Sequence, residues 1–130
     1  MPAPTRLIIA AALTFLGLAG AASAQTGESL FGDNCSACHQ VNGQGVQGAF
    51  PALAGDPFVT GDADAVIGVV LKGRGGMPTF KDDLKDPDIA AILTYVRGAW
   101  GNKAAAVTPA QVTAGRAKIG ASTQRGLQAH

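Results

Sequence analysis

Cys35-Ser36-Ala37-Cys38-His39 is the stretch that decides the fold of this chain. Two cysteines three residues apart, followed directly by histidine, form the C-x-x-C-H pattern of covalent haem attachment. On the first turns of a helix, thiols at this spacing point to one side, where each can add to a haem vinyl group. The next residue places an imidazole under the iron as its fifth ligand. The pattern predicts one haem c, held covalently by Cys35 and Cys38, with His39 as an iron ligand.

Three other interpretations of the two cysteines are open from the sequence. A thioredoxin-like C-x-x-C follows a strand in a βαβ unit, whereas residues 27–34 have a helical pattern. A structural zinc site needs further Cys or His ligands, and the only other histidine is His130. A simple disulfide leaves His39 without a role. Haem attachment accounts for all three residues and is the favoured interpretation.

Met77 is the candidate for the sixth iron ligand, in Gly73-Arg74-Gly75-Gly76-Met77-Pro78-Thr79-Phe80. A methionine thioether opposite the histidine is typical of electron-transfer haem proteins and raises the reduction potential. Met77 is the only methionine besides Met1. A methionine that fills a core gap usually has periodic, apolar neighbours, whereas the neighbours of Met77 are polar and Gly-rich. Lys72 and His130 are the alternative ligands.

The first 24 residues have the pattern of a signal peptide. Arg6 supplies a positive charge, residues 7–18 are apolar, and Ala22-Ser23-Ala24 matches the small-x-small cleavage pattern. An uncleaved membrane anchor is the alternative, but the apolar run is shorter than the roughly 20 residues that a spanning helix needs. We therefore expect cleavage after Ala24, export to the periplasm and no membrane span in the mature chain.

Charge and composition restrict the partners and the source of stability. Without Arg6, the remaining Lys and Arg residues equal the nine Asp and Glu residues in number, so the mature chain is nearly neutral. Nucleic-acid binding needs a surplus of basic residues and is not expected. The chain has 18 glycines and few aromatic residues. A small core of this kind needs its cofactor, so we expect the haem-free chain to be largely unfolded.

Helical patterns predict an all-α domain over residues 25–101. A first helix covers residues 27–38, with Thr26 as its N-cap, and a second begins near Asp62. A third has Asp86 as its cap and Pro87 at its first position, and its apolar face comprises Ile89, Ile92, Leu93 and Val96. No run alternates apolar and polar residues over the length of a strand.

Two further segments have weaker patterns. Residues 102–130 form a C-terminal extension, in which Thr108-Pro109 opens a short helix to about Ala117 and the last ten residues are disordered. Gly43 to Gly48 spell G-x-G-x-x-G, the dinucleotide fingerprint. That motif requires a preceding strand, and here a helix precedes it, so we interpret the segment as a loop around the haem.

The motifs together resemble those of class I cytochrome c proteins of the bacterial periplasmic type. The resemblance runs from about Gly27 to Gly101 and rests on the C-x-x-C-H motif and on Met77-Pro78 after a Gly-rich loop. It implies a small cytochrome c fold, with three or more short helices around one haem whose iron is bound by histidine and methionine. In that family the second imidazole nitrogen donates to a proline carbonyl, and Pro51 stands where that proline is expected.

More narrowly, residues 50–57, 75–80 and 89–97 resemble the cytochrome subunits of periplasmic, membrane-associated dehydrogenases. Those subunits often carry several such domains in one chain, whereas this chain has one C-x-x-C-H motif. The resemblance implies an electron carrier without catalysis of its own. It would be a shuttle between a periplasmic dehydrogenase and a terminal oxidase or other acceptor, or the haem subunit of a dehydrogenase complex. If Met77 is not a ligand, a haem enzyme or gas sensor with an open iron site is the alternative.

Large side chains outside the motifs are expected to line the haem pocket. Tyr95 and Trp100 either bond a haem propionate or pack between helices. Basic residues around Met77 form either a docking rim for a redox partner or a solvated mixed surface, because Asp82, Asp83 and Asp86 lie among them. The expected pocket residues are Phe50, Leu53, Phe80, Tyr95 and Trp100; the basic residues are Lys72, Arg74, Lys81 and Lys85.

Overall fold

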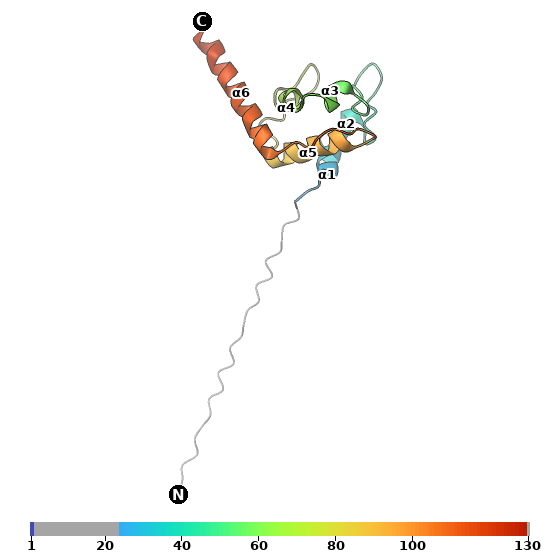
Figure 1. The fold of residues 1–130 in the computed structure, drawn as a ribbon, viewed down its shortest axis with the longest axis vertical. Coiled ribbons are helices and arrows are strands. Elements are labelled where there is room, and N and C mark those ends of the chain that lie inside the picture. The colour runs from blue at the N-terminus through green and yellow to red at the C-terminus, as the bar shows by residue number, and fades with distance from the viewer. Residues whose placement is uncertain (2–23, 130) are drawn as a thin grey trace.

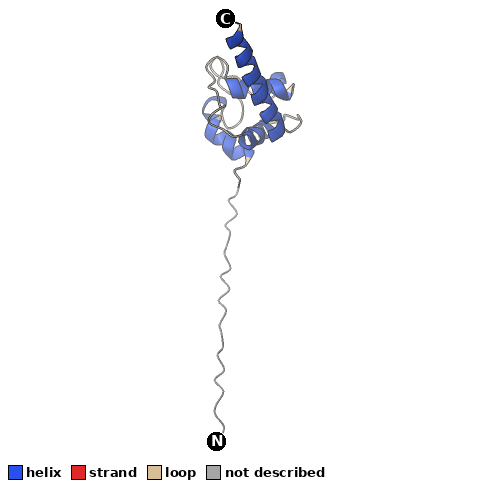
Figure 2. Ribbon diagram, turned by 90° about the vertical axis from the view of Figure 1, so that its left-hand side faces the viewer, coloured by secondary structure: helices blue, strands red, loops and turns tan. Residues whose placement is uncertain are grey.

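The computed structural model describes Met1 and residues 24–129, which form six helices joined by loops. The expected all-α class is confirmed: residues 24–129 contain no strand, only two isolated bridges, Val46–Phe50 and Arg74–Met77. Figure 2 shows the same composition of helix and loop. The predicted signal peptide lies almost entirely outside the described residues. The helices are α1 (Gly27–Asn34), α2 (Ser36–His39), α3 (Pro57–Thr60), α4 (Ala63–Lys72), α5 (Asp86–Gly98) and α6 (Pro109–Gln128).

Thr26 is the N-cap of α1, as predicted, and α4 begins next to Asp62, where the sequence placed the start of a second helix. Thr26 accepts a hydrogen bond from Ser29 N at the start of α1, and Asp62 accepts one from Asp64 N at the start of α4. The first predicted helix is broken at Cys35, whose backbone leaves the helical region and begins the separate turn α2. This break places the haem-attachment motif on a helical turn of its own.

Asp86 does not cap α5, so that prediction is wrong. The helix begins at Asp86 and its N-cap is Lys85, which makes no capping bond through its side chain. The Asp86 carboxylate turns instead to α6, where it accepts from Thr113 Oγ1 and Arg116 Nε, both at 2.5 Å. A partner on a distant helix has therefore replaced the local capping bond.

Helix α5 is the centre of the fold, with α1 crossing it and α6 running from near its start (Figure 1). Its inward face divides the core into two clusters of buried residues. The first lies between α4, α5 and α6, and the second between α1, α3 and α5. The first comprises Val66, Ile67, Leu71, Ile89, Ala90, Leu93, Val107 and Val112; the second comprises Leu30, Phe31, Val59, Ile92 and Val96.

Helix α6 differs most from expectation. The predicted end near Ala117 and the disorder beyond it are wrong, because the helix continues to Gln128. It starts with a capping box between Thr108 and Gln111, and Val112 is fully buried against α4 and α5. Gly115 permits close packing on α4, since a Cβ there would lie 2.7 Å from Ile67 Cγ2. A helix poor in large apolar residues can thus pack through one valine and one glycine.

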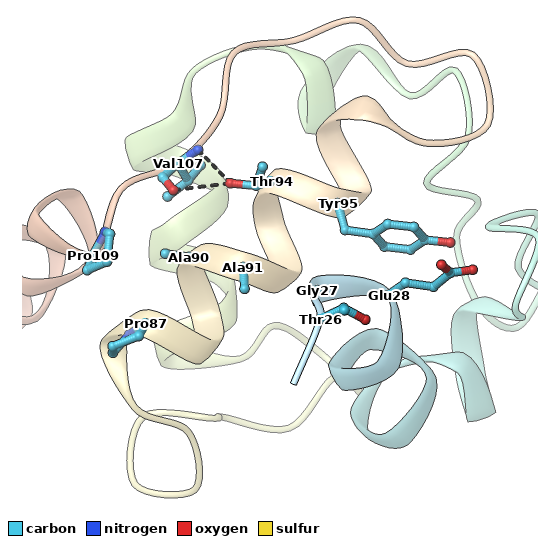
Figure 3. Close-up of a pocket in the computed structure, with 10 residues that line it drawn as sticks. All are labelled: Thr26, Gly27, Glu28, Pro87, Ala90, Ala91, Thr94, Tyr95, Val107 and Pro109. Atoms are coloured by element: carbon cyan, nitrogen blue, oxygen red, sulfur yellow. Dashed lines mark hydrogen bonds between the residues drawn. The ribbon is translucent and has the colours of Figure 1, made fainter. Parts of the chain in front are cut away.

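The segment between α5 and α6 returns alongside α5. Thr94 Oγ1 donates to the Val107 carbonyl and accepts from Val107 N, as Figure 3 shows. A shallow hollow lies there between α1, α5 and the start of α6. Its lining includes Glu28 and Tyr95 but no thiol, free imidazole or thioether. No helix within residues 24–129 combines the length and apolar character needed to cross a membrane.

The α5–α6 contact predicts a pH dependence of stability. Hydrogen bonds from Thr113 and then Arg116 lower the pKa of Asp86. A carboxyl with a lowered folded-state pKa contributes stability above its unfolded pKa, and this contribution is lost as the pH falls through the folded value. Asp86→Asn should therefore lower the unfolding free energy by on the order of 1 kcal/mol at pH 7. Denaturant unfolding of both proteins should show the gap closing in acid, and a gap independent of pH would contradict this account.

Candidate haem site

The two cysteines lie at the junction of α1 and α2. Cys35 N still donates to Phe31 O of α1 at 2.9 Å, while His39 N donates back to Cys35 O at 3.0 Å. Both thiols are free and half-buried. Burial, followed by the neighbouring Cys38, raises the pKa of the Cys35 thiol to about 11. A redox-active C-x-x-C site has a lowered thiol pKa instead, so this environment disfavours a thiol–disulfide oxidoreductase.

The His39 ring is buried and held in a single orientation. Its Nδ1 lies 2.9 Å from the carbonyl oxygen of Pro51, the contact that the resemblance implied. With Nδ1 protonated, His39 donates this hydrogen bond and Nε2 keeps the lone pair that a metal requires. The side chain is 8% exposed, so the ring has little freedom to turn away.

The loop that carries Pro51 is tied back on itself. Gly43 O accepts from Leu53 N at 2.7 Å and from Ala54 N at 3.0 Å. Gly43 has φ +68°, and a Cβ there would lie 2.4 Å from the Trp100 ring. Only glycine fits both constraints. The G-x-G-x-x-G stretch thus lies in a loop that follows a helix, as interpreted from the sequence, and forms no dinucleotide site.

The methionine segment is fixed by the last turn of α4. Arg74 and Met77 exchange backbone hydrogen bonds across a tight turn. Thr79 Oγ1 donates to Leu71 O at 2.6 Å, and Phe80 N donates to Val70 O at 3.0 Å. These contacts hold Met77 at one place relative to α4.

Met77 and His39 line the same apolar cavity. The cavity consists of two adjoining hollows that share their central lining. The shared residues are Cys35, His39, Pro51, Val69, Arg74 and Met77. The inner hollow adds Phe31, Ala52, Leu53, Asp56, Phe58, Val59, Val66, Val70, Ile92, Leu93 and Val96; the outer adds Asn34, Cys38, Ala49, Phe50, Gly76, Pro78 and Phe80.

This cavity fits a covalently attached haem. It brings both thiols of the motif, one imidazole with its outer nitrogen bonded, and one thioether to a single apolar space. Asp56 and Arg74 are the only carboxylate and guanidinium groups in its lining. Among the described residues, no group of three or more Cys, His, Asp or Glu is placed to hold a bare metal ion.

The cavity includes three of the five large side chains expected to line it. Phe50, Leu53 and Phe80 line it, whereas Tyr95 and Trp100 do not. Their rings pack against Phe31, Tyr95 tilted at 5.6 Å and Trp100 edge-on at 5.2 Å between centroids. Of these three aromatic residues, only Phe31 lines the cavity. Trp100 Nε1 donates to Val41 O at 3.2 Å. Both rings pack in the cluster between α1 and α5.

Two residues that shape the cavity were not predicted as site residues. Arg97 is 4% exposed and donates to the carbonyls of Val59, Gly61 and Ala105. Asn102 accepts from Gly55 N and donates to the carbonyls of Leu53 and Val96. Arg97 follows Leu93 by four residues on the inward helical face, a periodicity that could have revealed it. For Asn102 the sequence holds no such signal.

The basic residues around Met77 have different surroundings. Arg74 lies over the Phe58 ring, 4.8 Å from its centroid, at the cavity. Lys81 pairs with exposed Asp82 at 3.8 Å, and Lys72 and Lys85 are exposed.

Helical fold, haem-attachment motif and apolar cavity together define a c-type cytochrome. The family model described as cytochrome C oxidase, cbb3-type, subunit III matches residues 22–96. The chain belongs to this family of class I c-type cytochromes, and accordingly is a non-catalytic electron carrier with one covalent haem c.

Curated relatives include both small cytochromes and domains of larger subunits. A cytochrome c-552 of Thermus thermophilus is 34% identical over 83% of this chain and 95% of its own length. A cytochrome c6 of Leptolyngbya boryana is 34% identical over 58% of this chain and 91% of its own. The gluconate 2-dehydrogenase cytochrome c subunit of Pantoea cypripedii is 34% identical over 67% of this chain, which spans only 23% of that protein.

Proposed function

We propose that this chain is a periplasmic carrier of single electrons whose haem iron is bound by His39 and Met77. The observation that carries the proposal is that both side chains line one apolar cavity together with Cys35. Cys35 and Cys38 would hold the haem through thioether bonds, and the bound iron would supply a one-electron couple. The signal-peptide pattern of residues 1–24 supports export.

The protein's own residues give this site its chemistry. The Pro51 carbonyl, by accepting from Nδ1, orients the His39 ring and makes Nε2 a stronger ligand. Thr79 and Phe80 hold the methionine turn against α4. The valines and phenylalanines of the inner hollow exclude water, which favours the less charged, reduced state of an iron centre. A rigid site of this kind needs little rearrangement when its charge changes by one.

The test of ligation is the optical spectrum of Met77→Ala. The wild-type ferric protein should show a sulfur-to-iron charge-transfer band, and Met77→Ala should lose it completely while keeping its covalent haem. The reduction potential should fall by on the order of 100 mV or more, because the thioether favours the reduced metal. Potentiometric titration of both proteins measures this shift.

Lys72→Ala is the matched control, since Lys72 is the nearby alternative ligand and is exposed. It should keep the band and the potential of the wild type. A wild-type spectrum that is high-spin and unchanged in Met77→Ala would reject methionine ligation. A haem enzyme or gas sensor with an open iron site would then be the better interpretation.

The carrier would act as a shuttle between a periplasmic dehydrogenase and a terminal oxidase or other acceptor, or as a bound haem subunit of a dehydrogenase. The similarity to the gluconate dehydrogenase subunit supports the second form, and that to cytochrome c-552 supports the first. Gel filtration of native periplasmic extract distinguishes them. A bound subunit elutes with a large dehydrogenase, and a shuttle elutes near its own mass.

A further inference from the structure

The segment that carries Met77 is anchored at two ends. Directly after Met77, hydrogen bonds from Thr79 and Phe80 tie the segment to the last turn of α4, the helix that precedes it. Gly73 has φ +73°, and a Cβ there would lie 2.6 Å from Met77 O, so the turn is closed tightly. On its C-terminal side, residues 81–85 form a turn with no such bond to α4. A different element holds that turn.

That element is α6, acting through Arg116. The Arg116 guanidinium donates from Nη1 to Lys81 O, from Nη2 to Leu84 O at 2.7 Å, and from Nε to Asp86 Oδ1 at 2.5 Å. One planar group thus closes the turn that ends the methionine segment and fixes it to the first residue of α5. The Arg116 and Asp86 side chains are 27% and 24% exposed, so water competes only partly for these bonds.

The turn that Arg116 binds is itself in contact with the core, and Arg116 comes from outside the matched domain. Leu84, whose carbonyl Arg116 binds, packs against both core clusters. Arg116 also lies outside residues 22–96, the part of the chain that matches the family model. The restraint is therefore supplied by a helix that this chain carries in addition to the matched domain.

We propose that Arg116 is a positioning residue that keeps the Met77 segment closed over the haem site. This inference rests on the proposed ligation of the iron by Met77. Small ligands can reach the iron only when Met77 leaves it, so their apparent affinity scales with the fraction of molecules in which the segment is open. Loss of the Arg116 contacts should raise that fraction while leaving the closed state itself unchanged.

The test is equilibrium binding of imidazole to the ferric holoprotein with the full chain. Arg116→Gln should bind imidazole about tenfold more tightly than the wild type, in proportion to the larger open fraction. Arg116→Lys, which keeps the charge but loses the planar fork, should show a smaller increase in the same direction. Without imidazole, both variants should keep the sulfur-to-iron band.

Two controls separate this role from general destabilisation. Lys118 lies on α6 like Arg116 and forms an exposed ion pair with Asp64 of α4. Lys118→Gln removes this pair and should leave the imidazole affinity unchanged. Thr26→Ala removes the cap of α1, far from the methionine segment, and should lower the melting temperature without changing the affinity. If Arg116→Gln fails to fold, Arg116→Lys carries the test.

The outcomes distinguish this inference from the proposed function. Met77→Ala sets the affinity of an open site. If the wild type binds imidazole as tightly as Met77→Ala, Met77 is not a ligand and both proposals fail. If Met77→Ala binds tightly, the wild type binds weakly and the folded Arg116 variants match the wild type, only the role of Arg116 is rejected. An affinity that rises equally in Thr26→Ala would also reject it.

Discussion

Replacement of Cys35 and Cys38 together by serine should produce a chain that retains no haem after denaturation and is largely unfolded. The inner hollow is lined by core residues, among them Phe31, Val59 and Ile92, whose packing is incomplete without a group filling the space. Folded domains of this size are stable by only about 5–15 kcal/mol. The binding free energy of the cofactor is part of that stability, and the remaining core is too small to replace it. Far-UV circular dichroism should show loss of most helical signal.

Ala37→Ser is the matched control for this double variant. Ala37 lies between the two cysteines and is exposed, so serine there changes neither thiol and buries no polar group. It should keep covalent haem and a native circular dichroism spectrum. A double serine variant with no haem, native helical content and a cooperative thermal transition would show that the core is complete without the cofactor.

The second large effect is expected for Arg97→Met. Methionine approximates the length of the arginine stem but leaves the carbonyl oxygens of Val59, Gly61 and Ala105 without their donor. Only the bond to Val59 O is fully buried, and the other two are part-buried. A buried acceptor left without its donor costs about 1–3 kcal/mol, so the unfolding free energy should fall by on the order of 2 kcal/mol. Denaturant titration of the holoprotein measures the loss, with an unchanged m-value indicating that only stability has changed.

Arg125→Met tests whether the effect depends on burial. Arg125 is exposed near the end of α6, and removing it should change the unfolding free energy by less than about 0.5 kcal/mol. Equal losses in the two variants would mean that a net change of charge, and not the buried donor, determines stability. Because Val59 lines the cavity, Arg97→Met should also weaken retention of the Met77 band.

Features that depend on neighbouring residues were predictable from the sequence. The spacing of Cys35, Cys38 and His39 acts within one helical turn, and the capping oxygen of Thr26 reaches a backbone group three residues away. Periodicity over 89–96 identified the inward face of α5. The all-α class follows from these local patterns, and the Pro51 contact was implied by resemblance rather than by any local rule.

Helix α6 shows why local patterns fail elsewhere. Its composition suggested disorder because the segment contains few large apolar residues. Its stability in the fold comes instead from the positions of a few residues. Val112 enters the core, Gly115 permits contact with α4, and Arg116 binds a segment 32 residues earlier in the chain. None of these contacts leaves a periodic trace in the sequence.

The sequence by itself therefore determined the cofactor, its attachment motif, the candidate ligands and the helical class, because each depends on residue identity and on spacings within one or two turns. Only the tertiary structure decided that Tyr95 and Trp100 stay outside the cavity and that Asp86 serves α6 instead of capping α5. The physical reason is that a polar or aromatic group takes the best partner that the folded chain brings to it, and that partner often lies tens of residues away.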